Sequence, residues 1–429
     1  MEWKAHGYRV GSSNETFDEL PTDVDELDRF VALHRRLIEP WLSAVFQAEH
    51  LNLLLGSGFT TSVAFAAGVG ATGMETAAGK SAHAKAIMDH ATASAKKMGR
   101  GEANIEDQLR SSIAVLNGLD IIDKDAAEAV RADINTAIET FLHSLLATER
   151  YIADANSAPA SAMLQSFLLS FASRAASRER LHVFTTNYDR LIERGCDDAG
   201  LRIIDRFVGT LRPLFRNTRI ELDYHYNPPG IRGEPRFMEG VVRLTKLHGS
   251  LDWRFDEEAR RIYRAETPFG AEEDHPSLPA SPVDTVMIYP NPAKDVETTQ
   301  YPYAELFRDF ASATCRPNSV VVTYGYGFGD DHINRVLLDT LSVPSAHLVI
   351  IAFNLDDRII RFLAQTRPAQ VSLLAGRHFG SLQRLVADYL PKPALDYISG
   401  RMSEILKNRA FTAPGAQAAD PAYKPGDAA

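Results

Sequence analysis

The sequence is poor in cysteine and contains no long apolar run. Cys196 and Cys315 are the two cysteines among 429 residues, too few for a disulfide framework or a zinc site of four thiolates. No stretch approaches the roughly 18 apolar residues of a membrane span, and the N-terminal residues lack the apolar core of a signal peptide. We therefore expect reduced thiols, no membrane association and a cytoplasmic location.

An excess of positive charge is also absent. The chain has 46 basic and 56 acidic residues, a formal net charge of -10. A chain of this sign is repelled by the phosphate backbone of nucleic acids and by anionic membranes, so we expect no direct nucleic-acid binding. Its apolar content of 45% is typical of a globular protein with a large core.

Hydrophobic periodicity divides the chain into a mixed α/β part and a mainly helical part. Over about 81–179 the apolar residues recur at three and four positions, which predicts a helical insertion or lobe. Elsewhere short β-branched segments alternate with helical patterns, which favours a Rossmann-like, doubly wound parallel sheet covered on both faces. Strands are expected at 51–55, 181–187, 242–249, 285–290, 319–327, 347–354 and 370–376.

We expect the Rossmann-like domain to consist of residues 51–80 and 180–392, on either side of the insertion. The remaining segments are defined by polar or Pro/Gly-rich composition. They are an N-terminal arm and helix over 1–50, loop excursions at 212–240 and 254–284, a C-terminal helix over 393–410 and a disordered tail over 411–429.

The loop "GSGFT" at residues 56–60 follows an apolar strand. Gly56 and Gly58 would let the backbone approach an anion, and the N–H groups at the start of the next helix would face it. An ordinary strand-to-helix turn has the same pattern, and Gly-x-Gly alone does not decide between them. The third glycine of the dinucleotide fingerprint is missing, which argues against a standard dehydrogenase.

Two polar residues follow the strand in "FTTNYDRLIE". Asn187 and Asp189 come at the carboxyl end of the strand, which is the ligand-binding edge of a doubly wound sheet. Asn and Asp are also common helix caps, and a cap explains both residues equally well.

A histidine ends the next apolar strand in "KLHGSLDW". His248 can act as a base near neutral pH, and Gly249 permits a sharp turn after it. A single histidine at a strand end is also compatible with a structural role.

A third strand end, "TYGYGFGDDHIN", contains Gly325, Gly327 and Gly329. A glycine loop at a helix start suits a nucleotide, and Asp330 or Asp331 would cap the helix or accept hydrogen bonds from ribose. The following strand ends in Asn354. Since parallel strands present their carboxyl ends at one edge, these separate polar strand ends together predict a ligand site.

The ordered motifs resemble those of the sirtuin superfamily, in its bacterial sirtuin-like form. Sirtuins carry a Gly-Ala-Gly loop, a Gln-Asn-x-Asp strand end, a His-Gly, a Gly-Thr-Ser-type loop and a strand-ending asparagine. The similar segments are Gly56-Ser57-Gly58, Thr186-Asn187-Tyr188-Asp189, His248-Gly249, the loop Gly325–Gly329 and Asn354.

Departures from the family pattern indicate the subtype. The four cysteines of the deacylase zinc module have no counterpart after His248, and the Pro-Asp-Phe-Arg stretch is missing. The chain therefore resembles the sirtuin-like effectors of bacterial anti-phage defence, which hydrolyse NAD. Its length and long N-terminal lead are most similar to the group that works with a HerA-type ATPase.

The resemblance implies NAD as substrate, no zinc, a homo-oligomer and a HerA-type ATPase partner. It implies that Asn187 holds the ribose or the attacking water, that His248 is the base, and that Asp189 orients them or caps the helix. The implied cofactor-binding residues are Gly56, Ser57, Gly58 and Thr60 for the pyrophosphate, Gly325, Tyr326, Gly327, Asp330, Asp331 and Asn354 for the adenosine end, and in addition Phe59 and Thr186. The alternatives are a non-catalytic scaffold that senses NAD or ADP-ribose, and an NAD-dependent deacylase or ADP-ribosyltransferase.

Overall fold

The computed structural model describes residues 5–392. It leaves out 99–100, 176, 218–221, 227–235, 257, 280–285 and 289–300 within that range. The expected C-terminal helix at 393–410 and tail at 411–429 lie outside the described residues, as do parts of the expected loop excursions.

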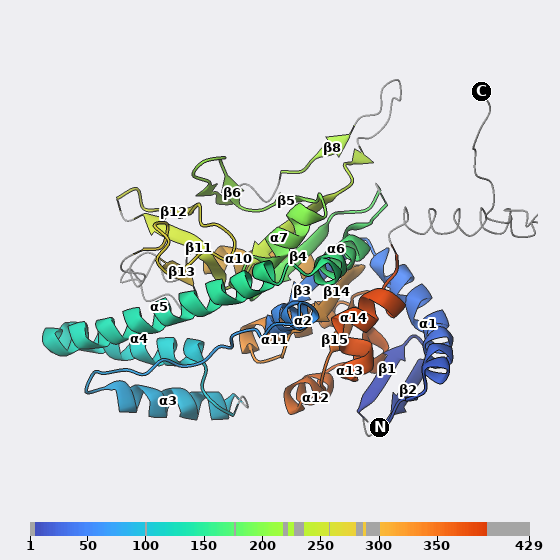
Figure 1. The fold of residues 1–429 in the computed structure, drawn as a ribbon, viewed down its shortest axis with the longest axis horizontal. Helices are drawn as coiled ribbons and strands as arrows, with labels where there is room; N and C mark the ends of the chain where they lie inside the picture. The colour runs from blue at the N-terminus through green and yellow to red at the C-terminus, as the bar shows by residue number, and fades with distance from the viewer. Residues whose placement is uncertain are drawn as a thin grey trace, which may run out of the picture. The chain divides into compact units, whose positions relative to one another are not determined.

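The largest sheet of the described residues has nine strands in the order β2-β1-β16-β15-β14-β3-β4-β10-β5 (Figure 1). Every pair from β16 to β5 is parallel. The parallel α/β fold expected from the sequence is thus confirmed. The strands are β1 (His6–Val10), β2 (Ser13–Phe17), β3 (His50–Leu55), β4 (Leu181–Thr185), β5 (Arg202–Ile204), β10 (Val241–Lys246), β14 (Ser319–Tyr324), β15 (His347–Ala352) and β16 (Val371–Ala375).

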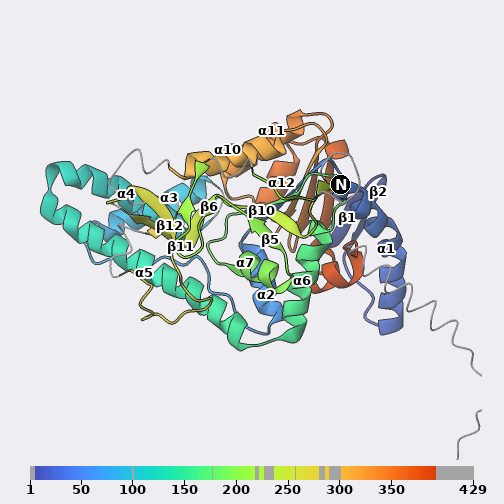
Figure 2. The same ribbon diagram turned by 90° about the horizontal axis from the view of Figure 1, so that it is seen from above.

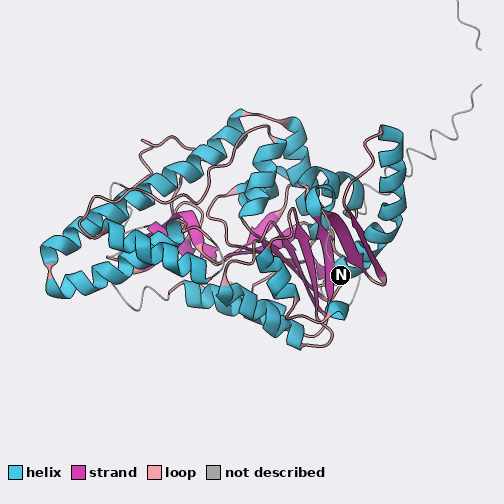
Figure 3. Ribbon diagram, turned by 90° about the horizontal axis from the view of Figure 1, so that it is seen from below, coloured by secondary structure: helices cyan, strands magenta, loops and turns pink. Residues whose placement is uncertain are grey.

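Helices cover both faces of this sheet, because successive side chains of its central strands point to opposite faces. Leu53 belongs to the apolar cluster on one face and Leu54 to the cluster on the other. Figure 3 shows the strands flanked by helices. The first face carries α1 (Val24–Phe46), α2 (Ser57–Ala66), α6 (Ala158–Ala172), α7 (Leu191–Asp198), α13 (Gly376–Gly380), α14 (Leu382–Arg384) and the π-helical turn η3 (Leu385–Tyr389). The second carries α10 (Tyr303–Thr314), α11 (Asp331–Ser342) and α12 (Asp357–Leu363), and a short 3-10 turn, η2 (Pro368–Gln370), precedes β16.

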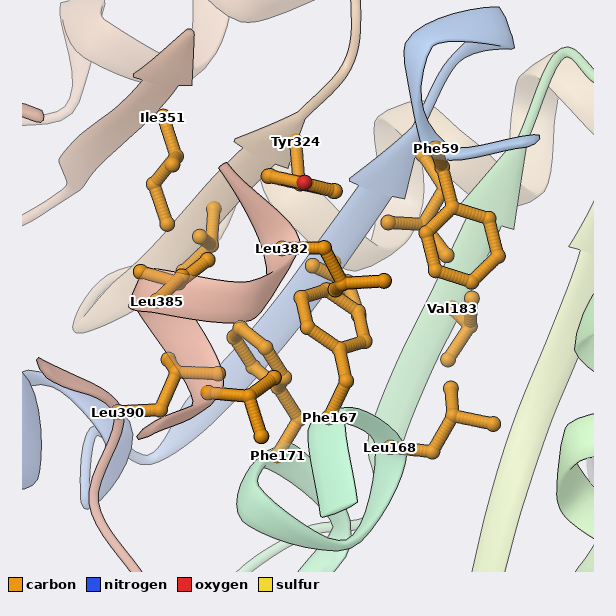
Figure 4. Packing of buried hydrophobic residues seen from close by; sticks show 14 of the residues in the cluster. Phe59, Phe167, Leu168, Phe171, Val183, Tyr324, Ile351, Leu382, Leu385 and Leu390 are labelled. Carbon is orange, nitrogen blue, oxygen red and sulfur yellow. The ribbon is translucent and has the colours of Figure 1, made fainter. Parts of the chain in front are cut away.

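Aromatic side chains fill the core beneath α2 (Figure 4). Phe59 of α2 is fully buried, with its ring centroid 5.5 Å from that of Phe167 and 6.3 Å from that of Tyr324. Burial of one such ring stabilises a fold by about 1.5–3 kcal/mol. The start of α2, which follows the first glycine loop, is therefore held firmly against the sheet.

Residues 6–17 form a β-hairpin instead of the expected N-terminal arm. β1 pairs antiparallel with β16 and with β2, so that the hairpin extends the sheet at its edge. Tyr8 is fully buried and Val10 nearly so, and their burial outweighs the polar character of the surrounding sequence. The helix that follows begins at Val24, where the Asp23 side chain accepts from the Glu26 N–H as an N-cap.

The helical insertion consists of α3 (Ala84–Lys97), α4 (Ile105–Ile122) and α5 (Lys124–Asp154). Figures 1 and 2 show α4 and α5 side by side as a long hairpin that leads away from the large sheet. A capping box between Asn104 and Asp107 starts α4, and Asp123 both ends α4 and caps α5. The insertion has its own apolar cluster, which also includes Tyr188 and Leu251 from the α/β part. Helix α6 packs on the sheet and not in this cluster.

A second, antiparallel sheet includes strands from both segments where loop excursions were expected and from the residues that flank them. Its order is β13-β11-β12-β7-β6, and β8 and β9 form a separate pair. The strand expected at 285–290 is β13 of this second sheet and not a strand of the large one. The elements are β6 (Phe207–Val208), β7 (Leu214–Phe215), β8 (His225–Tyr226), β9 (Arg236–Phe237), β11 (Gly249–Asp256), β12 (Arg261–Arg264) and β13 (Val286–Ile288). None of the described helices is at once long and apolar enough to cross a bilayer.

Candidate active site

A cavity lies at the carboxyl ends of β3, β4 and β14, where the sheet meets the helical insertion. Its walls come from the first glycine loop, the end of β4, the turn after β10, the loop after β14, and the insertion with the segment before it. The lining residues used below are Gly56, Ser57, Thr60, Asn104, Glu106, Phe141, Leu145, Thr186, Asn187, Tyr188, Asp189, His248, Tyr326, Gly327, Asp330 and Arg358.

Two glycine loops interlock at one end of this cavity. A Cβ atom on Gly56 would lie 2.5 Å from the Gly325 carbonyl oxygen, and one on Gly58 would lie 2.8 Å from the Gly325 Cα. Gly325 itself has φ +63, and a Cβ there would lie 2.3 Å from the Phe59 nitrogen. Side chains at these positions would force the loops apart, so glycine is required for their close approach.

Asn187 is held in one orientation by its own amide group. Its Nδ2 donates to the Gly56 carbonyl oxygen at 3.0 Å and to Thr60 Oγ1 at 2.9 Å. The two amide hydrogens therefore both have protein acceptors, and this network assigns the opposite end of the amide as Oδ1. The side chain can then serve a ligand as an acceptor: Oδ1 can receive a hydrogen bond from a water or a hydroxyl.

Asp189 supports this orientation and also accepts a backbone hydrogen bond at the start of α7. Thr60 Oγ1 donates to Asp189 Oδ2 at 2.6 Å, while the Leu191 N–H donates to Asp189 Oδ1 at 3.1 Å at the start of α7. Lys246 Nζ donates to the Asp189 carbonyl oxygen at 2.5 Å. Both polar residues of the strand end line the cavity, and the N-cap residue of α7 is Arg190, which makes no side-chain capping bond.

His248 lies in the turn between β10 and β11, where Gly249 has φ +88. The imidazole is 2% exposed, and its Nδ1 lies 3.3 Å from Glu106 Oε1. Glu106 comes from the first turn of α4 and also accepts from the Tyr188 hydroxyl at 2.5 Å. A carboxylate of the insertion therefore contacts a histidine of the α/β part.

The other ring nitrogen of His248, Nε2, lies 3.4 Å from His332 Nε2. Burial lowers the pKa of His248, but the hydrogen bond and negative charge of Glu106 outweigh it, so the pKa is raised above the ordinary 6.5. Burial and the nearby His248 lower the pKa of His332 to about 4. The two histidines thus differ in protonation over the acidic to neutral range.

The structure brings together most of the residues expected at the site. Those that line the cavity are Gly56, Ser57, Thr60, Thr186, Asn187, Asp189, His248, Tyr326, Gly327 and Asp330. Gly58 and Gly325 do not line the cavity, but they allow the two loops to approach each other closely. Phe59 lies in the core beneath α2, because it points from the buried face of that helix. Asp331 and Asn354 are exposed and lie outside the cavity lining. Asp330 is the N-cap residue of α11, but its side chain makes no capping bond.

Several lining residues were not expected from the sequence. Glu106 and Phe141 come from the insertion, and Arg358 from the start of α12. Acidic residues are common in the first turn of a helix because they interact favourably with the helix dipole. The sequence around Glu106 therefore gave no indication that this residue belongs to the site. Arg358 follows the Asp356 cap of α12, where a charged residue is also ordinary.

A buried ion pair joins the insertion to the strand end that carries Asn187. Arg190 Nη2 lies 2.6 Å from Glu149 Oε2, and the Arg190 backbone N–H donates to Glu149 Oε1 at 2.8 Å. The Gly270 N–H donates to the same carboxylate at 3.1 Å. Since removing one partner of such a pair leaves a buried charge, the insertion and the end of β4 are strongly coupled.

No group of three or more His, Cys, Asp or Glu side chains suited to a metal ion occurs in the part of the chain that the structure describes.

Comparison with known proteins gives one family match. Residues 181–367 match the model described as a SIR2-like domain. The matched segment contains Asn187, Asp189, His248 and the Gly325 loop, and it lies outside the first glycine loop and the α3–α5 insertion. The match supports a sirtuin-like, NAD-related domain over this part of the chain.

Among solved structures, a Sir2 homologue with a serine-to-alanine substitution, in complex with ADP-ribose, aligns with 85% of this chain and 98% of its own. The identity is 10% and the TM-score 0.39. No curated protein sequence matches the chain.

Proposed function

We propose that the chain binds NAD in this cavity and hydrolyses the bond between nicotinamide and ribose C1′. The observation that carries the proposal is the meeting of an oriented Asn187 and a carboxylate-paired His248 beside a glycine loop at the ligand edge of the sheet. The SIR2-like domain match over residues 181–367 supports NAD as the nucleotide.

The proposed reaction consumes one water and yields nicotinamide, ADP-ribose and a proton. The nicotinamide of NAD is already cationic and leaves without being protonated, so no strong general acid is needed. Its departure leaves an oxocarbenium-like ribose, as in other glycosyl cleavages. Asn187 Oδ1 accepts from the attacking water or a ribose hydroxyl, and His248 takes the proton that is released.

The proposal is tested by incubating the purified protein with NAD and quantifying nicotinamide and ADP-ribose. We expect both products in equal amounts, and we expect Asn187→Ala to lower turnover by about 10²-fold or more. Asn354→Ala is the matched control, because this amide is exposed and lies outside the cavity. Equal turnover of wild type and Asn187→Ala would contradict the proposal.

Two other outcomes would point to the alternative functions. Tight NAD or ADP-ribose binding without release of nicotinamide, under every condition including the assembled state, would indicate a sensing scaffold. Loss of acetyl groups from an acetylated peptide only when NAD is present would indicate a deacylase, and label transfer from NAD to protein an ADP-ribosyltransferase.

We also propose that the protein is a cytoplasmic, homo-oligomeric effector of anti-phage defence that acts with a HerA-type ATPase. This part rests on the resemblance of the motifs. The test is the NAD assay run with and without the product of the neighbouring gene, together with the mass of the complex in solution. An absence of binding and of any change in turnover would contradict the partnership.

A further inference from the structure

We propose that Glu106 is the positioning residue for His248: its carboxylate fixes the imidazole through Nδ1, so that Nε2 is the nitrogen that exchanges a proton with the ligand. The inference deepens the proposed function and rests on it for the reaction, while the pairing itself can be tested without NAD. It assigns a role at the site to a residue of the helical insertion.

The geometry around Glu106 fixes the carboxylate in place. It is 7% exposed, and the Tyr188 hydroxyl donates to Oε1 at 2.5 Å, the same oxygen that lies 3.3 Å from His248 Nδ1. Glu106 also occupies the first turn of α4, whose start is fixed by the Asn104–Asp107 capping box. Negative charge is favoured at a helix N-terminus, so the position stabilises an ionised carboxylate beside the histidine.

The other side of the imidazole is not held as firmly. His332 Nε2 lies 3.4 Å from His248 Nε2, at the outer limit of a hydrogen bond. Because the pKa of His332 is lowered to about 4, its ring is neutral near pH 7 and adds no second positive charge. A hydroxyl or a water in the cavity can therefore replace this contact and meet His248 Nε2.

Charged and titratable groups reach His248 from three elements. Glu106 and Arg110 come from α4, Asp330 and His332 from the start of α11, and the Tyr188 ring lies 6.1 Å away at the end of β4. Helix α10 contributes the apolar ring of Phe307, whose centroid lies 6.3 Å from that of His248. Burial and Arg110 lower the pKa of His248, but Glu106 and then Asp330 raise it, and the net direction is upward.

This pairing matters for proton transfer. A histidine that accepts a proton becomes an imidazolium, which an adjacent buried carboxylate stabilises and orients. Without the carboxylate, an imidazolium that is only 2% exposed would lose its main counter-charge, and Asp330 would be the remaining negative group that acts on it. Glu106 thus acts through His248 and not on the ligand.

The first test measures the His248 titration directly by following imidazole C–H shifts in NMR spectra between pH 5 and 9. Assignment uses His248→Gln, which removes one signal. We expect the wild-type pKa to lie above 6.5, Glu106→Gln to move it downward, and Glu106→Asp, which keeps the charge, to retain most of the upward shift. Asp107→Asn is the matched control, because it removes a buried carboxylate from the same turn that serves the capping box.

The second test is the pH profile of NAD turnover. Neutral His248 is the active base, so turnover rises as pH passes upward through its pKa. Glu106→Gln should move this acidic limb to lower pH and reduce the plateau about 10²-fold, with the Glu106→Asp variant recovering part of the loss.

The outcomes separate the two proposals. A wild-type His248 that titrates below 6.5, or one whose titration is the same in Glu106→Gln, overturns the role of Glu106 whether or not NAD is cleaved. An equal effect of Asp107→Asn would also overturn it, since that result indicates only helix docking. If the wild type releases no nicotinamide, the proposed function fails. The imidazole titration then still shows whether Glu106 is paired with His248.

Discussion

The two ends of the parallel sheet each hold a cavity and a buried histidine, yet the chemistry of the two ends differs. The cavity at the carboxyl ends has a volume of ≈ 320 Å³ and contains His248, while the one at the amino ends has ≈ 350 Å³ and contains His182. Both imidazoles are almost fully buried. Neither the volume nor the presence of histidine identifies the candidate site.

The charges around each histidine do distinguish the two ends. Burial lowers the pKa of His182 well below 6.5, and the positive charges of Arg243, Arg316 and Arg206 lower it further. His248 faces the carboxylate of Glu106, and its pKa is raised. One histidine is therefore a neutral core residue, while the other is able to carry a proton.

The arginines at the amino ends are matched by carboxylates of the fold. Arg180 pairs with Asp223 at 3.1 Å, and Arg206 binds both oxygens of Asp309 at 2.6 Å. At the carboxyl ends, amide, hydroxyl, imidazole and glycine backbone groups border the cavity together with the side chains of Glu106, Asp189, Asp330 and Arg358. The two ends therefore differ in which charges surround the histidine, because arginines surround His182 and a carboxylate contacts His248.

The largest expected difference between the ends is in catalysis. We expect His248→Ala to lower NAD turnover by about 10²–10⁴-fold, the usual contribution of a general base. His182→Ala should leave turnover per folded molecule within about twofold, because its Nε2 is hydrogen-bonded to Thr245 Oγ1 away from the cavity. Initial rates of nicotinamide release, normalised to folded protein, measure both variants, and equal losses would remove the distinction.

The next effect concerns stability at the amino ends. Asp309→Ala leaves the Arg206 guanidinium buried without its bidentate partner, so we expect a loss of about 3–5 kcal/mol in the free energy of unfolding. Glu305→Ala is the control, because its pair with Arg308 is exposed and contributes less than about 1 kcal/mol. Urea denaturation compares the two. A small effect of Asp309→Ala would show that this network is not required for the fold.

The glycine loops give a smaller effect at the carboxyl ends. Gly325→Ala combines a positive φ with a Cβ placed 2.3 Å from the Phe59 nitrogen, so we expect destabilisation by at least about 1–3 kcal/mol and weaker nucleotide binding. Gly118→Ala, in α4 at a position where an added Cβ has nothing within 4 Å, should instead stabilise by up to about 1 kcal/mol. Thermal unfolding and NAD titration calorimetry measure both changes. Unchanged binding by Gly325→Ala would mean that the loops need not interlock.

The smallest effect is the pH dependence of stability, in which the two histidines act in opposite directions. Because the pKa of His182 is lowered in the folded state, its contribution to the free energy of unfolding is fully present above pH 6.5 and is lost as the pH falls towards the folded pKa. The loss is at most about 1.4 kcal/mol per pH unit. Because the folded pKa of His248 is raised, its contribution is present below 6.5 and is lost as pH rises through the folded value. The free energies of unfolding of His182→Gln and His248→Gln are measured at pH 5.5 and at pH 8. Relative to the wild type, the two substitutions should change the difference between these pH values in opposite directions, and changes in the same direction would contradict the comparison.

The sequence was sufficient to predict β3, β4, β10, β14, β15 and β16 of the parallel sheet, but not β5, and it predicted the strand ends after β3, β4, β10 and β14 that meet at the cavity. Apolar runs such as that at β14 are buried on both faces, and a run of this kind is visible without the fold. Asn187, His248 and the first glycine loop were found because each follows such a run directly. Their individual roles remain predictions that the proposed assays test.

Other features depend on tertiary contacts that no local pattern reveals. Glu106 looks like an ordinary first-turn acid until the fold brings it to His248, 142 positions later in the numbering but 3.3 Å away in space. The polar stretch at residues 6–17 forms a hairpin because β16 offers it an open edge. Phe59 is in a glycine-loop motif, yet helical geometry directs its ring into the core.

The insertion contacts the cavity only through the base of its hairpin. Asn104, Glu106, Phe141 and Leu145 line the cavity, whereas Ile121 and Ile122 end α4 at the tip of the hairpin and are largely exposed. Matched lengths of both helices could therefore be added or removed at the tip without moving a lining residue. The length of the α4–α5 hairpin can therefore differ between related proteins, or be changed by design, without a change in the cavity lining.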